Sequence, residues 1–182
     1  MIPGPTDVLV VVDVQNGFVT SKSQHIIPVV VDLVRRWQTA GAPVLMTRYI
    51  NHPDSPYIDY LGWSKMQSSP EIDIVNELQE YASLAHVMDK RVYTTFTAEG
   101  RALFDQQGWN TTYIVGLDTE SCVAQTAVGA FETGRRPVVI IDGCASHAGN
   151  EAHQAGLFVM SRNIGKSQLV TSADLGLATP VP

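Results

Sequence analysis

Cysteine is scarce in this chain of 182 residues, which contains only Cys122 and Cys144. Two cysteines cannot form the disulfide framework of a small secreted scaffold, and we expect both thiols to be reduced. Each cysteine is therefore considered separately. Cys144 opens a loop after an apolar strand, where we expect it to behave as a small buried hydrophobic residue.

Charged residues are also few, at 16% of the chain, and acidic residues exceed basic ones to give a net charge of -6. The basic residues are scattered apart from two doublets, at 35–36 and 135–136. A nucleic-acid surface needs clustered lysine and arginine. We therefore expect no nucleic-acid partner.

The sequence lacks a long hydrophobic run. Asp13 interrupts the apolar stretch Val8–Val12 well before the roughly 20 residues that a membrane-spanning helix needs. The N-terminal segment Met1–Pro5 has neither the basic region nor the apolar core of a signal peptide. We expect a soluble cytoplasmic protein with no membrane partner, folded as a single domain over residues 1–182.

Apolar strands alternate with helical patterns along the chain. Strands are expected at Asp7–Val12, Pro43–Thr47, His86–Lys90, Thr111–Val115, Pro137–Ile141 and Ser167–Val170. Helices are expected at Ile26–Ala40, Ile72–Ala82, Thr97–Gln107, Ser121–Thr133 and Glu151–Arg162. This alternation predicts an α/β fold with a central, mostly parallel sheet of about six strands and helices on both faces.

The segment from residue 48 to 70 has no periodicity and is rich in aromatic residues, proline and asparagine. A long loop of this kind inside a compact domain is typical of a binding loop or lid. A surface excursion or an oligomer contact is the alternative.

Three residues with complementary chemistry each follow a different expected strand: Asp13, Lys90 and Cys122. Taken alone, a strand-end Asp is a turn former and a Lys is a solvated residue. In a parallel sheet, however, strand ends meet at one edge, where ligands bind. Cys122 also lies near a helix start with Thr119 as the expected N-cap, and the positive helix end favours thiolate.

These residues lie in motifs at 12–18, 89–93, 116–123 and, more loosely, 142–146, and with them the chain resembles the isochorismatase-like cysteine hydrolases. The resemblance implies a three-layer α/β/α Rossmann-like fold and a homo-oligomer. It implies a catalytic triad of Asp13, Lys90 and Cys122. It also implies a cis peptide between Leu117 and Asp118, with the backbone N–H groups of Asp118 and Cys122 as the oxyanion hole.

The implied reaction is hydrolysis of a carbon–nitrogen bond in a small amide, carbamoyl or ureido substrate, through a thioester on Cys122. Two alternatives stay open. One is a non-hydrolytic protein that binds a metabolite or senses oxidants through its thiol. The other is hydrolysis of an ether or ester, as in isochorismatases, although those relatives lack the cysteine.

No cofactor and no metal are expected. Nicotinamidases of this family carry a metal on an Asp-x-His unit and further histidines, but the matching positions here are Ile50, Asn51 and His52. A single histidine does not make a metal site, so His52 is expected to be a polar lid residue or a substrate contact.

Substrate contacts are expected from Phe18, Trp63 and Phe96, which would line an apolar pocket, and from the amide of Gln15. The alternative is that the aromatic residues belong to the core and that the glutamine forms a cap. His147 and His153 are expected to lie in a loop and on a helix surface.

Overall fold

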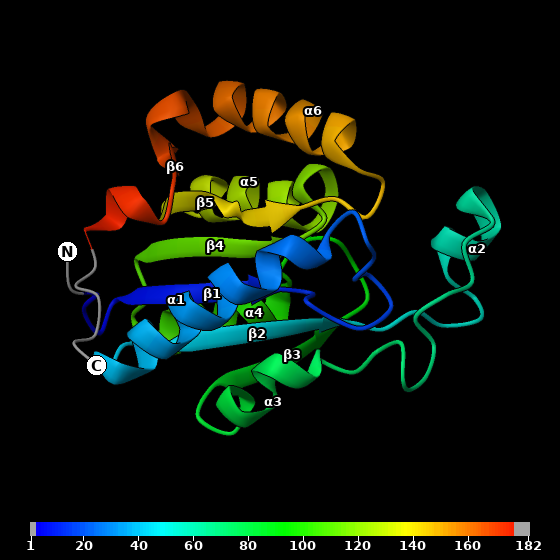
Figure 1. Cartoon of the computed structure of the whole chain (residues 1–182), viewed down its shortest axis with the longest axis horizontal. Helices are drawn as coiled ribbons and strands as arrows, with labels where there is room; N and C mark the ends of the chain where they lie inside the picture. The colour runs from blue at the N-terminus through cyan, green and yellow to red at the C-terminus, as the bar shows by residue number, and fades with distance from the viewer. Residues whose placement is uncertain (1–2, 177–182) are drawn as a thin grey trace.

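The computed structural model describes residues 3–176 and shows a six-stranded sheet between two layers of helices (Figure 1). All strand pairs are parallel, in the order β3-β2-β1-β4-β5-β6. The strands are β1 Asp7–Val12, β2 Val44–Tyr49, β3 His86–Lys90, β4 Thr111–Leu117, β5 Arg136–Ala145 and β6 Leu169–Val170. This confirms the expected α/β fold.

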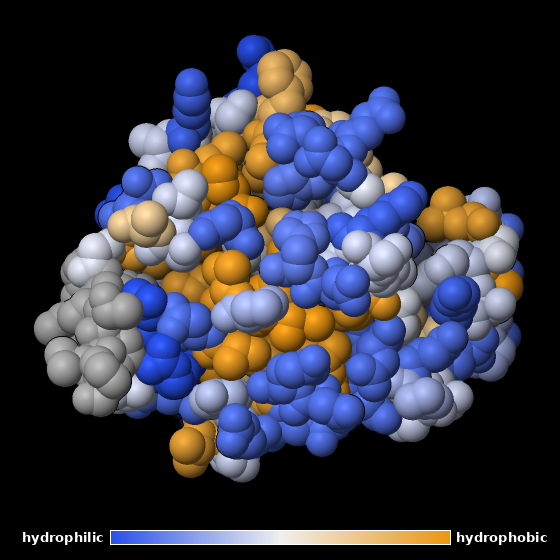
Figure 2. All heavy atoms as spheres, viewed as in Figure 1, coloured by the Kyte–Doolittle hydropathy of each residue, from blue (hydrophilic) through white to orange (hydrophobic). Residues whose placement is uncertain are grey.

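The helices are α1 Ile27–Thr39, α2 Pro56–Leu61, α3 Asn76–Ala82, α4 Ala98–Gln107, α5 Ala124–Glu132 and α6 Asn150–Met160. Helices α1 and α3 pack on one face of the sheet, and α4, α5 and α6 pack on the other. Polar side chains cover much of the surface on the side shown in Figure 2, with apolar surface visible between them. No helix within residues 3–176 is long and apolar enough to cross a membrane.

The central strand β1 is apolar at every position after Asp7 because both of its faces are covered. Leu9 and Val11 join the core under α1, whereas Val8, Val10 and Val12 join the core under α4 and α5. The chain runs outward from β1 to β3 and then returns to place β4 on the other side of β1. Strand order thus reverses between β1 and β4, where α/β sheets form their ligand crevice.

The structure differs from the sequence-based expectation at several element ends. The loop after β2 contains the short helix α2, in which Ser55 accepts a hydrogen bond from Ile58 N–H at the start. The helix expected from Ile72 begins at Asn76, because Ile74 pairs with Gln15 instead. Strand β5 continues to Ala145 through a register shift, so residues 142–145, expected as a loop, are extended.

Candidate active site

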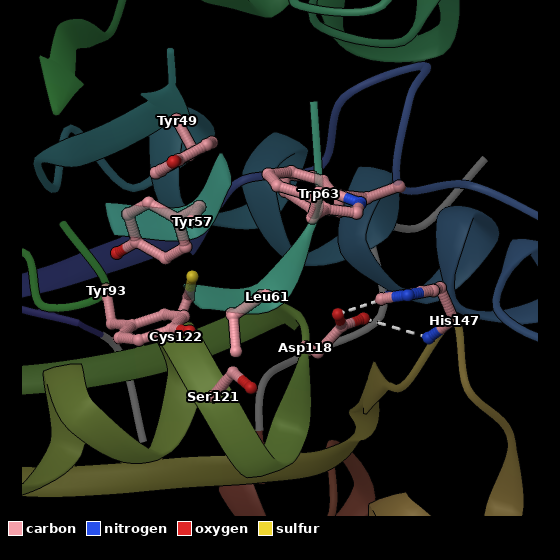
Figure 3. Close-up of a pocket in the computed structure, with 10 residues that line it drawn as sticks. Tyr49, Tyr57, Leu61, Trp63, Tyr93, Asp118, Ser121, Cys122 and His147 are labelled. Atoms are coloured by element: carbon pink, nitrogen blue, oxygen red, sulfur yellow. Dashed lines mark hydrogen bonds and ion pairs between the residues drawn. The ribbon is translucent and has the colours of Figure 1, made fainter. Parts of the chain in front are cut away.

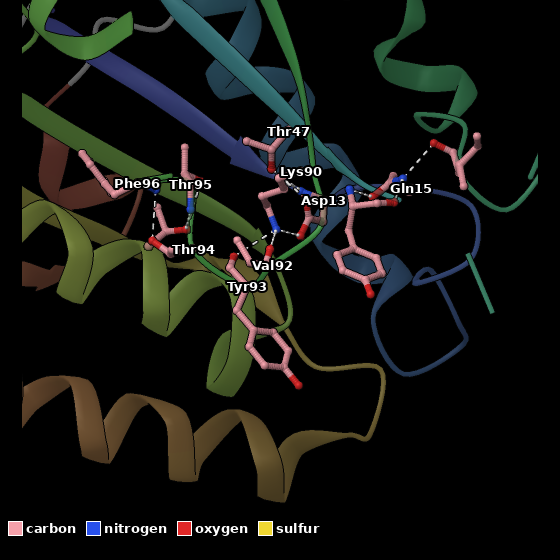
Figure 4. A network of polar contacts seen from close by, with 12 residues as sticks. Asp13, Gln15, Thr47, Lys90, Val92, Tyr93, Thr94, Thr95 and Phe96 are labelled. Atoms are coloured by element: carbon pink, nitrogen blue, oxygen red, sulfur yellow. Dashed lines mark hydrogen bonds and ion pairs between the residues drawn. The ribbon is translucent and has the colours of Figure 1, made fainter. Parts of the chain in front are cut away.

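A buried ion pair joins the ends of β1 and β3. Lys90 Nζ lies 2.6 Å from Asp13 Oδ2, and both side chains are completely buried (Figure 4). Asp13 directly follows β1 and has a positive φ of 50°, a conformation that Asp and Asn adopt more readily than most residues. Its other carboxylate oxygen accepts a hydrogen bond from the Thr47 hydroxyl at 2.7 Å. The carboxylate is therefore fixed on both sides.

Three oxygen atoms surround the Lys90 ammonium. Besides Asp13, the backbone carbonyls of Val92 and Tyr93 accept its hydrogen bonds at 3.0 and 2.9 Å. Burial lowers the pKa of Lys90, but interactions with Asp13 and Cys122 outweigh burial, so the net shift is upward. The three oxygen atoms therefore favour the charged form of Lys90 despite its burial.

The Cys122 thiol interacts with both members of this pair. The structure thus brings together the three strand-end residues that the sequence places on one edge. Burial raises the pKa of Cys122 well above its usual range, the Asp13 charge raises it further, and the Lys90 charge opposes them. This upward shift opposes the expected preference of the helix end for thiolate, because loss of water around the sulfur favours the neutral thiol.

The turn that carries Cys122 begins with a cis peptide between Leu117 and Asp118. Gly116 precedes it at φ 123°, and a Cβ atom there would lie 2.1 Å from the carbonyl oxygen of Val12. Only glycine allows β4 to approach the end of β1 so closely. The expected cis peptide is present.

A π-helical turn, Thr119–Val123, follows and leads into α5. The Asp118 carbonyl accepts hydrogen bonds from the N–H groups of Ser121 and Val123, which flank Cys122. In an α-helix, that carbonyl would accept the N–H of Cys122. The expected N-cap is wrong, because Asp118 occupies that position and the Thr119 hydroxyl bonds to His153 Nδ1 at 2.7 Å.

The loop between β5 and α6 holds this turn in place. Glu120 accepts a hydrogen bond from the Ser146 hydroxyl at 2.6 Å, and one Asp118 oxygen accepts the backbone N–H of His147 at 2.8 Å. The other Asp118 oxygen pairs with the His147 ring at Nδ1. His147 lies in a loop and His153 on α6, as expected, but their hydrogen bonds to Asp118 and Thr119 add a role that the sequence does not indicate.

A pocket of about 280 Å³ opens above the thiol (Figure 3). Its walls are mainly aromatic, with a few polar groups. The lining residues are Phe18, Tyr49, Tyr57, Leu61, Trp63, Tyr93, Asp118, Ser121, Cys122 and His147. Helix α2 and the loop that follows it supply Tyr57, Leu61 and Trp63, so the segment after β2 does form one wall of the pocket.

Phe18 and Trp63 line the pocket as expected, and their rings stack at 5.9 Å with an interplanar angle of 15°. Gln15 does not line it. Its amide donates to the carbonyls of Tyr49 and Ile72 and accepts the N–H of Tyr49, which ties the loops together (Figure 4). Tyr49 and Tyr57 belong to the segment expected as a lid but were not singled out from the sequence, and Tyr93 was not expected in the pocket, because these contacts depend on how the loops fold.

Phe96, which we expected in the pocket, and Cys144, which we expected in the core, both lie in the core. Phe96 is buried against Phe104, with ring centroids 4.7 Å apart, and does not line the pocket. Cys144 is buried as expected, and burial raises its pKa to about 12. Neither residue is a candidate for substrate contact.

The comparison with known families gives a match over nearly the whole chain. A family model described as the isochorismatase domain matches residues 7–173. A nicotinamidase from Acinetobacter baylyi is 40% identical over 68 residues, covering 32% of this chain and 32% of that protein. The chain thus matches about a third of the length of this relative.

Several solved structures share the fold over more than nine-tenths of the chain. An isochorismatase family protein from Desulfovibrio vulgaris has a TM-score of 0.80 and 22% identity, covering 94% of this chain and 96% of that one. N-carbamoylsarcosine amidase from Thermoplasma acidophilum has a TM-score of 0.78 and 23% identity, covering 91% and 95%. At these identities, the likeness establishes the fold.

A pyrazinamidase from Pyrococcus horikoshii, solved in complex with zinc, has a TM-score of 0.78 and 24% identity, covering 92% of this chain and 99% of that one. In the loop after β2 of this chain, the possible metal ligands are few. Ile50 has no donor atom, and Asn51 uses its amide to hold the carbonyls of Trp63 and Lys65. His52 remains alone, and residues 3–176 contain no group of three or more His, Cys, Asp or Glu placed to hold a metal ion. These residues do not fit a metal site.

Proposed function

Since the chain belongs to the isochorismatase family, we propose that it is a cysteine-dependent hydrolase that cleaves the carbon–nitrogen bond of a small amide, carbamoyl or ureido compound. The observation that carries this proposal is the contact of the Cys122 thiol with the buried Asp13–Lys90 pair at the base of an aromatic pocket. A thiol, a carboxylate and an ammonium in contact at one pocket are the groups that nucleophilic attack on a carbonyl carbon needs, which supports the proposal.

Asp13 is the proposed base. It accepts the Cys122 proton as the sulfur attacks the substrate carbonyl carbon, so that a carbon–sulfur bond forms and charge moves onto the carbonyl oxygen. Moving a proton from the thiol to the carboxylate leaves the net charge of the site unchanged. As Asp13 becomes neutral by accepting the proton, the Lys90 ammonium pairs instead with the negative charge that develops on the sulfur. A raised thiol pKa is compatible with this concerted step, because no free thiolate has to accumulate.

The proposed oxyanion hole consists of the backbone N–H groups of Asp118 and Cys122. The π-helical turn supports this role, because it directs the Asp118 carbonyl to Ser121 and Val123. The N–H of Cys122 is thereby released from the bond that an α-helix would give it.

The second half of the reaction releases the amine and restores the enzyme. The tetrahedral intermediate collapses, the carbon–nitrogen bond breaks, and the Asp13 carboxyl gives its proton to the leaving nitrogen. Water then attacks the thioester while Asp13 accepts a proton from it. Cleavage of the carbon–sulfur bond returns that proton to Cys122 and frees the acid product.

The names of the relatives agree with this reaction class, since the nicotinamidase and the N-carbamoylsarcosine amidase are both named for cleavage of carbon–nitrogen bonds. The raised pKa of Cys122 argues against the oxidant-sensor alternative, because oxidation requires thiolate. Hydrolysis of an ether or ester on the same scaffold differs in one observable: it releases no ammonia or amine.

A screen of small amides, carbamoyl compounds and ureides for ammonia release tests the proposal, with Cys122→Ala as the control. We expect at least one compound to be hydrolysed by the unaltered protein and none by the variant. Cys144→Ala is the matched control, because this buried thiol lies outside the pocket. Equal turnover by the Cys122→Ala protein would refute the proposal.

A further inference from the structure

The side wall of the pocket contains an ion pair to which the proposed reaction assigns no task. His147 and Asp118 are joined both through the imidazole and through the backbone N–H of His147. The His147 side chain is 45% exposed, whereas that of Asp118 is 7% exposed. Both residues line the same cavity as Cys122. The imidazole is therefore accessible to a ligand, and in Figure 3 the Asp118 carboxylate lies between it and Cys122.

The pairing determines which atom of His147 is available. Both Asp118 oxygens accept hydrogen bonds, so Nδ1 of His147 carries a proton. The second ring nitrogen, Nε2, has no hydrogen-bond partner among residues 3–176. Among the side-chain nitrogens of the pair, it is the atom that remains for a ligand.

The surrounding charges favour the protonated ring. The hydrogen bond to Asp118 raises the pKa of His147 and burial lowers it; the charges of Asp118 and Glu120 raise it, and Lys65 lowers it. The net shift is upward, which extends the pH range in which Nε2 carries a proton. In that range Nε2 donates a hydrogen bond, and the ring attracts an anion.

The position of the Asp118–His147 pair relative to the Cys122 thiol determines which part of a bound substrate the pair contacts. Cys122 and His147 lie at opposite ends of the pocket (Figure 3). On the His147 side of the pocket, the Phe18 ring lies 6.2 Å from the His147 ring and stacks on Trp63. Parallel aromatic faces favour a flat ligand.

We propose that the Asp118–His147 pair binds the end of the substrate remote from the scissile bond, and selects a small planar amide that carries a hydrogen-bond-accepting oxygen there, above all a carboxylate. This inference rests on the proposed function for the location of the scissile bond. The pair acts in binding and specificity, since His147 is remote from the attacking sulfur. Lys65 adds a second positive charge near the same end.

Binding to an inactive protein tests this proposal separately from turnover. The probes are 3- and 4-carbamoylbenzoate, compared with 3- and 4-methylbenzamide, in which a methyl group replaces the carboxylate. Their dissociation constants are measured by calorimetry on Cys122→Ala and on Cys122→Ala combined with His147→Gln. A third protein combines Cys122→Ala with His86→Gln, which changes an exposed histidine that packs on Trp109 outside the pocket.

We expect one carboxylate isomer to bind at least about tenfold more tightly than its methyl counterpart at pH 6. His147→Gln should remove this preference, and His86→Gln should keep it. The preference should also decline as the pH rises through the pKa of His147. Retention of the preference in His147→Gln would overturn the proposal, and so would equal or undetectable binding of the two probe classes. Failure of the proposed function is read independently, from the absence of ammonia release by the unaltered protein.

Discussion

Lys90 Nζ and Asp13 Oδ2 are 2.6 Å apart in a site that excludes water from both side chains. Removing one member of a buried ion pair leaves the other charge unpaired, at a cost of about 3–5 kcal/mol in the free energy of unfolding. We expect Lys90→Met to show this loss in urea unfolding. Its hydrolytic activity should fall at least about 100-fold, because the thiolate then forms without a cation.

The double variant Asp13→Asn with Lys90→Met separates stability from catalysis. It contains no buried unpaired charge, and Asn keeps the positive φ of this position. We expect it to regain most of the stability lost by Lys90→Met while remaining inactive. If Lys90→Met alone lowered the free energy of unfolding by less than about 1 kcal/mol, the result would contradict the burial of this ion pair.

Alkylation by iodoacetamide measures the protonation of Cys122. Burial and the Asp13 charge raise its pKa, so the thiolate fraction at pH 8 should be below that of a free cysteine. In the Cys144→Ala protein we expect slow alkylation that accelerates only above about pH 9. An apparent pKa at or below about 8.5 would show instead that the helix end and Lys90 outweigh burial.

Gly116 and Gly134 form a matched pair for testing the close approach of β4 to β1. Both have positive φ, at 123° and 77°, but a Cβ atom meets the Val12 carbonyl only at Gly116 and meets nothing within 4 Å at Gly134. Gly134→Ala should cost about 1–2 kcal/mol in thermal unfolding, from φ alone. Gly116→Ala should cost clearly more and should also abolish activity, because Cys122 would be displaced. An equal loss of stability in the Gly116→Ala and Gly134→Ala proteins would show that the ends of β4 and β1 can move apart without cost.

Trp63 and Phe96 are aromatic residues with different predicted effects. Trp63 lines the pocket, so Trp63→Leu should raise KM for a planar amide with little change in the free energy of unfolding. Phe96 packs on Phe104 in the core, so Phe96→Leu should lower the stability and leave KM unchanged. The reverse pattern in the two measurements would contradict the pocket described above.

Chelation tests the expectation of a metal-independent enzyme. Asn51 is fully used in holding the loop after β2, and His52 stands alone there. We expect dialysis against EDTA to leave both activity and melting temperature unchanged. Loss of activity that zinc restores would show a metal site that these residues do not provide.

The sequence predicts the sheet well because strands covered on both faces are continuous apolar runs, as in Val8–Val12. Since the ends of parallel strands meet at one edge of the sheet, the positions of Asp13, Lys90 and Cys122 after three strands are enough to predict that they lie together. Element ends are less predictable. Strand β5 passes its expected end at Ile141 because it follows β4 through a register shift.

The remaining parts of the site depend on contacts between distant segments. Gln15 is polar and close to Asp13 in sequence, but its partners are backbone groups of Tyr49 and Ile72. The pairing of His147 with Asp118 spans 29 positions and has no local signal. The pKa of Cys122 is a balance between burial, a carboxylate and an ammonium, and the sequence does not show which dominates.

Intact-mass spectrometry of the protein, quenched in acid during turnover of an amide identified in the ammonia screen, tests the proposed thioester most directly. We predict a mass increase equal to the acyl group, located on Cys122 and absent from Cys122→Ala. It should disappear when the substrate is exhausted. Turnover at full rate by Cys122→Ala, or an acyl group located on another residue, would contradict nucleophilic attack by Cys122.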